Sequence, residues 1–207
     1  MVKDLRRDPM DQALAAWRKQ QRANLLAMRQ QIGMGALKAA TAVIARRLDA
    51  LLPMPGVSVL GLYWPIKREP NLLSWARDLV DRTQVTLCLP VVVTRQAPLA
   101  YWRWAPDDPM TTGLWDIPVP ARQDVVQPDM VLAPLVGFDG ARYRLGYGGG
   151  YFDRTLGALT RRPLAIGIGY EFSVLETIDP QPHDIPMDAV LTEKRALLPT
   201  QWRTPGT

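Results

Sequence analysis

Residues 57–89 read VSVLGLYWPIKREPNLLSWARDLVDRTQVTLCL, the pattern of a strand, a helix and a second strand. Residues 57–63 and 85–89 are short apolar runs, and residues 72–80 between them are predicted as a helix. Strands joined in this way pair in parallel, with a right-handed crossover. This unit predicts an α/β fold around one mostly parallel sheet.

Further apolar runs continue the predicted sheet toward the C-terminus. We expect strands at residues 99–104, 130–136, 164–170 and 189–192. Residues 105–128 are rich in Pro and Asp, and we interpret them as a long excursion from the sheet. A helix is expected to begin near Tyr151.

Two helices are predicted ahead of the sheet. Steps of three and four between apolar residues indicate an amphipathic helix at residues 10–31. Its apolar face is formed by Leu14, Trp17, Gln21, Leu25, Met28 and Ile32. Its other face carries Arg18, Lys19, Arg22 and Arg29.

The second helix is predicted at about residues 36–51 and ends at the cluster Pro53-Met-Pro-Gly56. Its inward side chains are Leu37, Ile44, Leu48 and Leu51. We expect one domain over residues 1–207, with N-terminal helices at about 10–51 and an α/β body at about 57–200.

Composition indicates a soluble cytoplasmic protein. The 207 residues are 47% hydrophobic and 22% charged, which is normal globular usage. The longest apolar stretch, 130–138, is far shorter than the roughly 20 residues of a membrane span. Residues 1–8 have no apolar core of a signal peptide, and the single cysteine, Cys88, is expected to be buried in a strand and free of disulfides.

The scarcity of histidine and cysteine excludes several chemistries. His183 and Cys88 are the only residues of their types, too few for a zinc site built from Cys and His. No Gly-x-Ser-x-Gly motif supplies a hydrolase nucleophile. The net charge of +5, with only five lysines among 25 basic residues, favours an anionic partner that arginine can bind. No basic run or motif indicates nucleic-acid binding.

Residues 138–156 carry the informative motif, FDGARYRLGYGGGYFDRTL. Four glycines at positions 146, 148, 149 and 150 precede the predicted helix, where backbone N–H groups can form an anion nest. Arg142, Arg144 and Arg154 flank the glycines, and Asp153 lies in the first helical turn. This combination fits a triphosphate with Mg²⁺. The spacing matches neither a Rossmann fingerprint nor a Walker A loop.

The run from Arg144 to Arg154 closely resembles the signature of the 5-formyltetrahydrofolate cyclo-ligase (methenyltetrahydrofolate synthetase) family. Weaker elements of the same family follow in the expected order, at Arg18-x-x-x-Arg22, Trp64-Pro-Ile-Lys-Arg-Glu69, Trp115-Asp-Ile-Pro118 and His183-Asp-Ile-Pro-Met-Asp188. The resemblance implies a monomer with a three-layer α/β/α sandwich.

The resemblance also implies a reaction. Such enzymes use ATP and Mg²⁺ to convert 5-formyltetrahydrofolate irreversibly into 5,10-methenyltetrahydrofolate, ADP and phosphate. The formyl oxygen attacks the γ-phosphate, N10 closes the ring, and phosphate leaves. The protein's task is to align two substrates and neutralise phosphate charge.

Site residues follow from the same resemblance. Those implied for ATP are Arg18, Lys19, Arg22, Arg144, Leu145, Gly146, Tyr147, Gly148, Gly149, Gly150, Tyr151 and Phe152. Those implied for the folate are Trp64, Glu69, Trp115 and Tyr151, with Glu69 accepting hydrogen bonds from the pterin. Arg144 and Tyr151 are the implied catalytic residues, and Asp153 and Asp184 the metal ligands, with Asp188 competing for the second position.

Several interpretations stay open on the sequence alone. Arg18 and Arg22 also fit a solvated helix face, and Trp102 and Trp104 fit either core or pocket. Phe152 replaces a tyrosine common in the family, so a role that needs its hydroxyl is lost. His183 is expected to order the Asp184 loop.

The partners and the function class also leave alternatives. The basic surplus suits a folate with a glutamate tail of undetermined length. The alternative function is a non-catalytic paralogue that binds nucleotide or folate as a regulator. Retention of Glu69, Arg144 and Asp153 together favours the enzyme.

Overall fold

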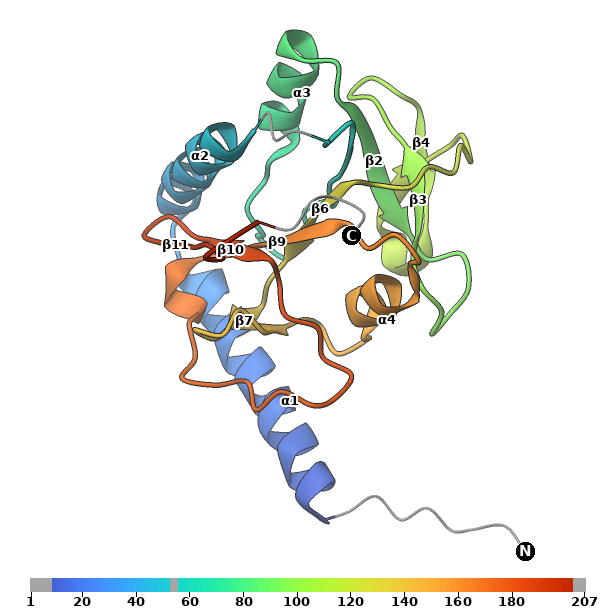
Figure 1. The fold of residues 1–207 in the computed structure, drawn as a ribbon. Coiled ribbons are helices and arrows are strands. Elements are labelled where there is room, and N and C mark those ends of the chain that lie inside the picture. Colours follow the sequence, from blue (N-terminus) through green and yellow to red (C-terminus); the bar gives the residue numbers. More distant parts are fainter. Residues whose placement is uncertain (1–8, 53–55, 203–207) are drawn as a thin grey trace, which may run out of the picture.

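The predicted strand–helix–strand unit is present in the fold, with its helix at the top of the view in Figure 1. The structure is a computed structural model that describes residues 9–52 and 56–202. Strand β1 (Val59–Gly61) leads through helix α3 (Leu73–Arg82) to strand β2 (Thr86–Val91), and the two strands are parallel, with Leu60 opposite Leu87. The parallel pairing predicted for this unit is therefore confirmed.

The remaining strands extend the sheet on both sides of this pair. Strands β6 (Met130–Pro134), β9 (Leu164–Ile168) and β10 (Ala189–Leu191) add in parallel, and β3 (Ala100–Arg103) pairs antiparallel with β2. In the described residues the sheet order is β11-β10-β9-β6-β1-β2-β3. Strand β11 (Ala196–Leu197), antiparallel to β10, is the one strand of this seven-stranded sheet, as described, that the sequence did not predict.

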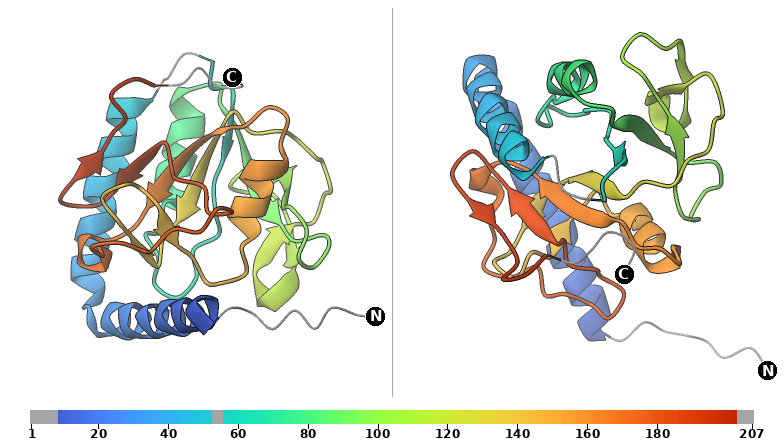
Figure 2. Two further views of the ribbon diagram at one scale, coloured as in Figure 1. Left: turned by 60° about the horizontal axis from the view of Figure 1, so that its bottom comes forward. Right: turned by 45° about the horizontal axis from the view of Figure 1, so that its top comes forward.

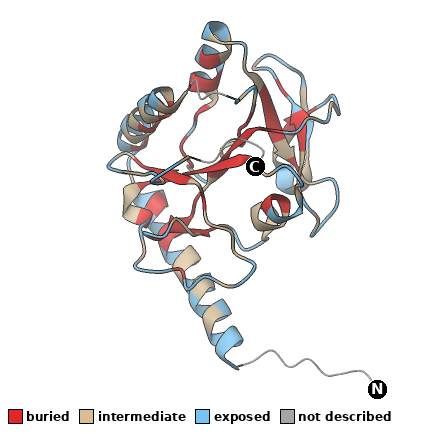
Figure 3. Ribbon diagram, in the orientation of Figure 1, coloured by how far each residue is buried: buried red, intermediate tan, exposed pale blue. Residues whose placement is uncertain are grey.

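Helices cover both faces of the sheet, as expected for three layers (Figure 2). On one face α2 (Met34–Leu51) and α3 pack through Ile44, Leu48 and Leu79 onto alternate strand residues. On the other face α4 (Tyr151–Ala158) packs through Leu156 against residues such as Val131. The buried residues accordingly gather on the central strands and on the inner sides of the helices (Figure 3).

Helix α1 (Pro9–Gln31) lies across the end of the sheet at which β6 leads into β7 (Gly137–Phe138) (Figure 2). Its predicted bounds are confirmed, but its predicted faces are partly wrong. Arg29, expected on the polar face, is fully buried, whereas Trp17 and Met28 are 36% and 46% exposed. The helix contacts the body through Leu25 as predicted, and also through its arginine side, where polar groups of the body meet the guanidinium groups.

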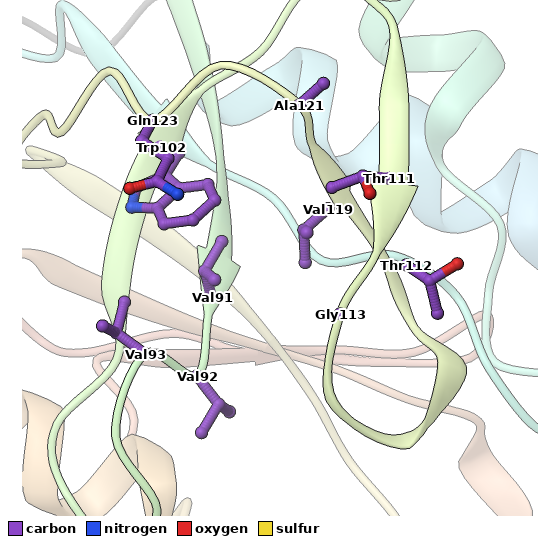
Figure 4. A pocket seen from close by; sticks show the side chains of 10 residues that line it. All are labelled: Val91, Val92, Val93, Trp102, Thr111, Thr112, Gly113, Val119, Ala121 and Gln123. Atoms are coloured by element: carbon purple, nitrogen blue, oxygen red, sulfur yellow. The ribbon is translucent and has the colours of Figure 1, made fainter.

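The excursion at residues 105–128 contains a small hairpin that was not predicted. Strands β4 (Met110–Thr112) and β5 (Pro118–Pro120) pair antiparallel around a 3₁₀ turn, η1 (Leu114–Asp116). A cavity of about 340 Å³ lies between this hairpin and strands β2 and β3 (Figure 4). Trp102 lines that cavity and packs with Val91 and Val119, whereas Trp104 packs into the main core.

Three smaller expectations concern the rest of the chain. Helix α2 ends at Leu51 as predicted, but the cluster Pro53–Pro55 and residues 1–8 lie outside the described residues. Cys88 is fully buried as predicted, and burial raises the pKa of its thiol to about 12. Within the described ranges, no helix has both the length and the apolar character needed to cross a membrane.

Candidate active site

A cleft of about 1800 Å³ opens at the carboxyl ends of the parallel strands. This is the edge at which α/β sheets commonly bind ligands. Its walls come from α1, the loop after β1, the β4–β5 hairpin, the glycine-rich loop with α4, and the loop at residues 181–185. Nearly all predicted site residues line it: Arg18, Arg22, Trp64, Glu69, Trp115, every residue from Arg144 to Asp153, and Asp184. Lys19 is exposed and does not line it.

The glycine-rich loop joins strand β8 (Arg144–Leu145) to α4. Gly148 has φ of +94° and Gly150, at the N-cap of α4, has φ of +64°. These left-handed conformations favour glycine because a Cβ atom is strained there. Leu145, by contrast, is buried in a small cluster with Leu25, so its side chain serves packing.

Two arginines bind carbonyl groups of this loop. Arg22 Nε donates to Gly146 O at 2.7 Å, and Arg154 donates to Gly149 O. The Arg154 guanidinium also lies 5.2 Å from the centroid of the Tyr151 ring. Arg142, predicted to flank the loop, instead donates from Nε to Met187 O at 3.1 Å and does not line the cleft.

Arg144 and Asp153 form a bidentate ion pair beneath the loop. The Nη1–Oδ1 and Nη2–Oδ2 distances are 3.1 and 3.0 Å, and the Arg144 side chain is 4% exposed. Burial lowers the pKa of Arg144, and the Asp153 carboxylate opposes that shift. The Phe152 ring centroid lies 5.3 Å from the Arg144 guanidinium, a cation–π contact that involves the ring and not a hydroxyl.

A second arginine–carboxylate pair connects α1 to the loop at residues 179–184. Arg18 Nη2 lies 2.6 Å from Asp184 Oδ2, and it also donates to Asp179 O at 2.8 Å. Burial alone would raise the pKa of Asp184, but hydrogen bonds from Arg18 and from Gln181 N–H lower it below its ordinary value. The Arg18 side chain is therefore not simply solvated.

The structure also shows where Asp188 and His183, the neighbours of Asp184 in the sequence, lie relative to the cleft. The Asp188 carboxylate accepts from Ala165 N–H at 2.7 Å and does not line the cleft, so Asp184 is the carboxylate of this motif that the cleft contains. His183 lines the cleft with a 77% exposed side chain, and its Nε2 lies 3.9 Å from Asp184 Oδ1. The hydrogen bonds that hold the Asp184 carboxylate come from Arg18 and Gln181.

Glu69 is buried, although a lone loop glutamate is ordinarily a surface residue. Its Oε2 accepts from Ile66 N–H at 2.9 Å and its Oε1 from the Tyr147 hydroxyl at 2.8 Å. Burial raises the pKa of Glu69 to about 7, although both hydrogen bonds and the charges of Arg29 and Lys67 oppose the shift. This carboxyl group can therefore change its protonation state near neutral pH.

Aromatic rings form much of the remaining cleft wall. Trp115 is 58% exposed and makes an edge contact with Tyr151, with 5.6 Å between ring centroids. Trp64 makes a similar contact with the buried Trp104 at 6.4 Å. Exposed indole and phenol faces of this kind can stack on a planar heterocycle.

Two residues that line the cleft, Lys67 and Tyr147, and the buried Arg29 that contacts Tyr147 were missed or given too small a role. Arg29 donates from Nη2 to Leu135 O at 2.6 Å, Lys67 Nζ lies 5.1 Å from the Tyr147 ring centroid, and Tyr147 reaches Glu69. Positions 18, 22 and 29 fall on one helical face, and that basic stripe was a signal in the sequence for Arg29. No sequence signal predicted the contact of Tyr147 with Glu69.

Two acidic residues of the cleft have oxygen donors of the kind that a hard metal ion takes. The described part of the chain contains no group of three or more His, Cys, Asp or Glu side chains suited to hold a metal ion. Asp153 and Asp184 line the cleft, and each is bound by an arginine. Mg²⁺ in nucleotide sites commonly takes one or two carboxylates besides phosphate oxygens and water, so this donor set is compatible with it.

Comparison with known proteins identifies similar sequences and structures. The sequence model described as the 5-formyltetrahydrofolate cyclo-ligase family matches residues 14–193. A protein named 5-formyltetrahydrofolate cyclo-ligase from Mycoplasma pneumoniae is 30% identical over 152 residues, covering 73% of this chain and 83% of that protein. One of the same name from Mycolicibacterium smegmatis is 29% identical over 144 residues, covering 66% and 74%.

Two solved structures have the same fold over most of their length. The 5,10-methenyltetrahydrofolate synthetase of Aquifex aeolicus, solved by NMR, aligns with a TM-score of 0.77 and 27% identity, covering 90% of this chain and 94% of that one. The 5,10-methenyltetrahydrofolate synthetase from Mycoplasma pneumoniae aligns with a TM-score of 0.71 and 26% identity, covering 85% and 98%.

Proposed function

The chain belongs to the 5-formyltetrahydrofolate cyclo-ligase family, and we propose that it converts 5-formyltetrahydrofolate and ATP into 5,10-methenyltetrahydrofolate, ADP and phosphate. The observation that carries the proposal is one cleft that contains both the glycine-rich loop with Arg144 and the buried Glu69. The first suits the phosphates of a nucleotide, and the second suits the donor edge of a pterin.

The reaction needs activation of the formyl group. Its oxygen attacks the γ-phosphorus, the bond to the β–γ bridging oxygen breaks, and ADP leaves. N10 then attacks the formyl carbon and loses its proton, and the C–O bond breaks to release phosphate and leave the N5–C–N10 amidinium. Phosphorylation thus turns a poor leaving group into a good one, and the protein contributes alignment and charge neutralisation.

The phosphate-binding residues are proposed from their places in the cleft. The backbone N–H groups of residues 146–150 and the N-terminus of α4 would receive the phosphates. Arg144 would neutralise developing charge from beneath the loop, and Arg18 and Arg22 would approach from α1. In the structure Arg18 is paired with Asp184, and Arg144 is paired with Asp153. Carboxylates therefore already position both guanidinium groups.

Mg²⁺ is proposed as the metal that accompanies ATP, with Asp153 and Asp184 as its protein ligands. Bound there, the ion would draw charge from the phosphate oxygens as a Lewis acid. The two carboxylates line the cleft, and neither belongs to a larger acidic cluster in the described residues. The ion is therefore expected to bind with the nucleotide rather than before it.

The folate is proposed to bind between Glu69 and the aromatic wall. Glu69 would accept hydrogen bonds from the amino group and ring N–H of the pterin, and Trp64, Trp115 and Tyr151 would pack on its planar rings. Tyr151 is also proposed as catalytic, because it stands at the junction of the glycine-rich loop and the aromatic wall. Lys67, at the cleft, and the net charge of +5 favour a substrate with a polyglutamate tail.

We further propose that the protein acts as a cytoplasmic monomer without nucleic-acid or membrane partners. The absence of a long basic run in the sequence and the small anionic ligands that the cleft suits support this assignment. Size-exclusion chromatography with light scattering tests the monomer: a mass near 23.2 kDa is expected, and twice that mass contradicts it.

The activity is tested by mixing the protein with 5-formyltetrahydrofolate, ATP and Mg²⁺ and recording the absorbance of the methenyl product. An ATP-dependent rise, with one ADP formed per product, is expected. If the protein binds both ligands without producing either compound, the alternative of a non-catalytic binding paralogue replaces the enzyme. The pairing of Arg144 with Asp153 inside the cleft favours catalysis over that alternative.

A further inference from the structure

Tyr147 joins two segments of the cleft that are far apart in the sequence. Its hydroxyl donates to Glu69 Oε1 at 2.8 Å, across 78 positions of the chain, and accepts from Arg29 Nη1 at 3.5 Å. The tyrosine belongs to the glycine-rich loop, and Glu69 belongs to the loop after β1. One side chain thus contacts both the phosphate-binding and the pterin-binding segment.

On the nucleotide side, Tyr147 is an anchor in a segment with little intrinsic order. It stands between Gly146 and Gly148, and glycine-rich backbone loses more conformational entropy than other sequences when it is fixed. Arg22 holds the carbonyl of Gly146 at 2.7 Å, and the bond from Tyr147 to Glu69 adds a second link to the body of the protein. Losing that link would free part of the loop.

On the folate side, Tyr147 holds the carboxylate that would bind the pterin. Glu69 Oε2 is engaged by Ile66 N–H and Oε1 by Tyr147, and a carboxylate accepts about four hydrogen bonds, so acceptor capacity is left for a ligand. Lys67 Nζ lies 5.1 Å from the centroid of the Tyr147 ring, and the fully buried Arg29 donates to the Tyr147 hydroxyl at 3.5 Å. The tyrosine therefore contacts one cation at its ring and another at its hydroxyl.

We propose that Tyr147 is a positioning residue that couples the two substrate sites. By fixing Glu69 and the glycine-rich loop in one arrangement, it makes occupancy of either site favour the arrangement that the other substrate needs. Thermodynamic linkage makes this effect reciprocal, so folate raises the affinity for ATP by the factor by which ATP raises the affinity for folate. The inference rests on the proposed function, since it requires both substrates to occupy this cleft.

The test is equilibrium binding of an ATP analogue whose β–γ bridge cannot be cleaved, with Mg²⁺, in the absence and presence of saturating 5-formyltetrahydrofolate. In the unchanged protein we expect folate to raise the affinity for the analogue at least about fivefold, within the usual range of coupling between sites. In Tyr147→Phe we expect the gain to fall below about twofold, and the affinity for the analogue alone to fall as well, because part of the glycine-rich loop is freed.

A matched control is Tyr143→Phe. Tyr143 is half-buried against the cluster around Leu25 and does not line the cleft, so the full coupling should remain. A merely structural effect of Tyr147→Phe would weaken binding of the analogue by the same factor with and without folate, so the fivefold gain would remain. If that variant unfolds, Tyr147→Met, which also lacks the hydroxyl, carries the same expectation.

The outcomes separate the inference from the proposed function. If the unchanged protein forms the methenyl product and Tyr147→Phe keeps the fivefold gain, only the role of Tyr147 is wrong. The same holds if the unchanged protein turns over without any folate-dependent gain. If the unchanged protein forms no product, the proposed function fails, and the inference fails with it.

Discussion

Glu69 changes its chemistry through burial. A loop glutamate in water is ionised at neutral pH, but here the surroundings raise its pKa to about 7. Only the carboxylate form can accept hydrogen bonds with both oxygens, so pterin binding should depend on pH in the neutral range. The hydrogen bonds from Ile66 N–H and the Tyr147 hydroxyl, and then the charges of Arg29 and Lys67, keep the pKa from rising further.

We therefore expect kcat/KM for the folate to rise about tenfold between pH 6 and pH 8, as Glu69 loses its proton. Because the pKa is raised, the loss of affinity lies on the acidic side of about pH 7. Steady-state kinetics at saturating ATP measures it. Glu69→Gln should raise the folate KM at least about tenfold and remove the rise between pH 6 and 8. A variant that keeps the wild-type pH profile would contradict this role.

Asp153 has a structural partner as well as a proposed metal. Its bidentate bond to buried Arg144 means that Asp153→Asn leaves a buried guanidinium without its counter-charge. We expect turnover to fall at least about a hundredfold, and the free energy of unfolding to fall by about 2 kcal/mol with the fold retained. Assays at saturating Mg²⁺ and urea unfolding measure the two effects.

The matched control for this variant is Asp129→Asn. Asp129 also pairs with an arginine, Arg161 at 2.9 Å, and accepts from Ser58 and Val59 N–H, but it lies outside the cleft. The Asp129→Asn variant should lose a similar free energy of unfolding, and its turnover should stay within about twofold of the unchanged protein. Equal losses of turnover in both variants would remove the special role of Asp153.

At the scale of elements, the glycine-rich loop depends on its backbone conformation. Gly148→Ala places a Cβ atom at φ of +94°, which is strained, although the space itself is sufficient because the nearest atom, Arg22 Cζ, is 3.5 Å away. We expect the free energy of unfolding to fall by about 1–2 kcal/mol and the KM for ATP to rise about tenfold. Thermal unfolding and steady-state kinetics measure these changes.

Gly140→Ala is the control for this loop. Gly140 does not have a positive φ, a Cβ atom there meets nothing within 4 Å, and the residue lies outside the cleft. Both stability and the KM for ATP should stay unchanged. An ATP KM in Gly148→Ala equal to that of this control would show that the loop tolerates another conformation.

Helix α1 illustrates how an element gains a function from its position. Its C-terminal half contacts the body through Leu25 and Arg29, and Arg18 and Arg22 reach the two loops that border the cleft. The buried side is basic because carbonyl and carboxylate groups surround it. The helix therefore forms one wall of the cleft and supplies positive charge to it.

At the scale of the whole molecule, ligands should stabilise the fold by binding only the native state. ATP with Mg²⁺ at about a hundred times its dissociation constant adds about 2.7 kcal/mol, which raises Tm by about 5–10 °C in a chain of this size. Differential scanning fluorimetry measures the shift.

Removal of the metal should change the thermal shifts of the two ligands differently. EDTA should abolish most of the shift produced by ATP and leave the shift produced by 5-formyltetrahydrofolate unchanged, because only the nucleotide is proposed to bring Mg²⁺ to Asp153 and Asp184. An ATP shift that EDTA does not alter would contradict the proposed metal ligands.

The sequence by itself determined the order of elements and the chemistry of the main loop. Apolar periodicity and turn residues are local properties, so β1, α3 and β2, and the start of α4 at Tyr151, lie where the pattern predicts them. The glycines and Asp153 are adjacent in the chain, which made their association readable without a structure. The short edge strand β11 and the β4–β5 hairpin carry too little periodicity to be read in the same way.

Only the tertiary structure decided which distant residues meet. The contact of Glu69 with Tyr147 joins residues 78 positions apart, and the pairing of Arg18 with Asp184 joins residues 166 positions apart. The burial of Glu69 also depends on this packing. The burial of Arg29 depended equally on which groups of the body pack against α1. Local sequence fixes a side chain's place on its own helix or loop, but packing of the elements fixes its environment, and the environment sets its charge and its partners.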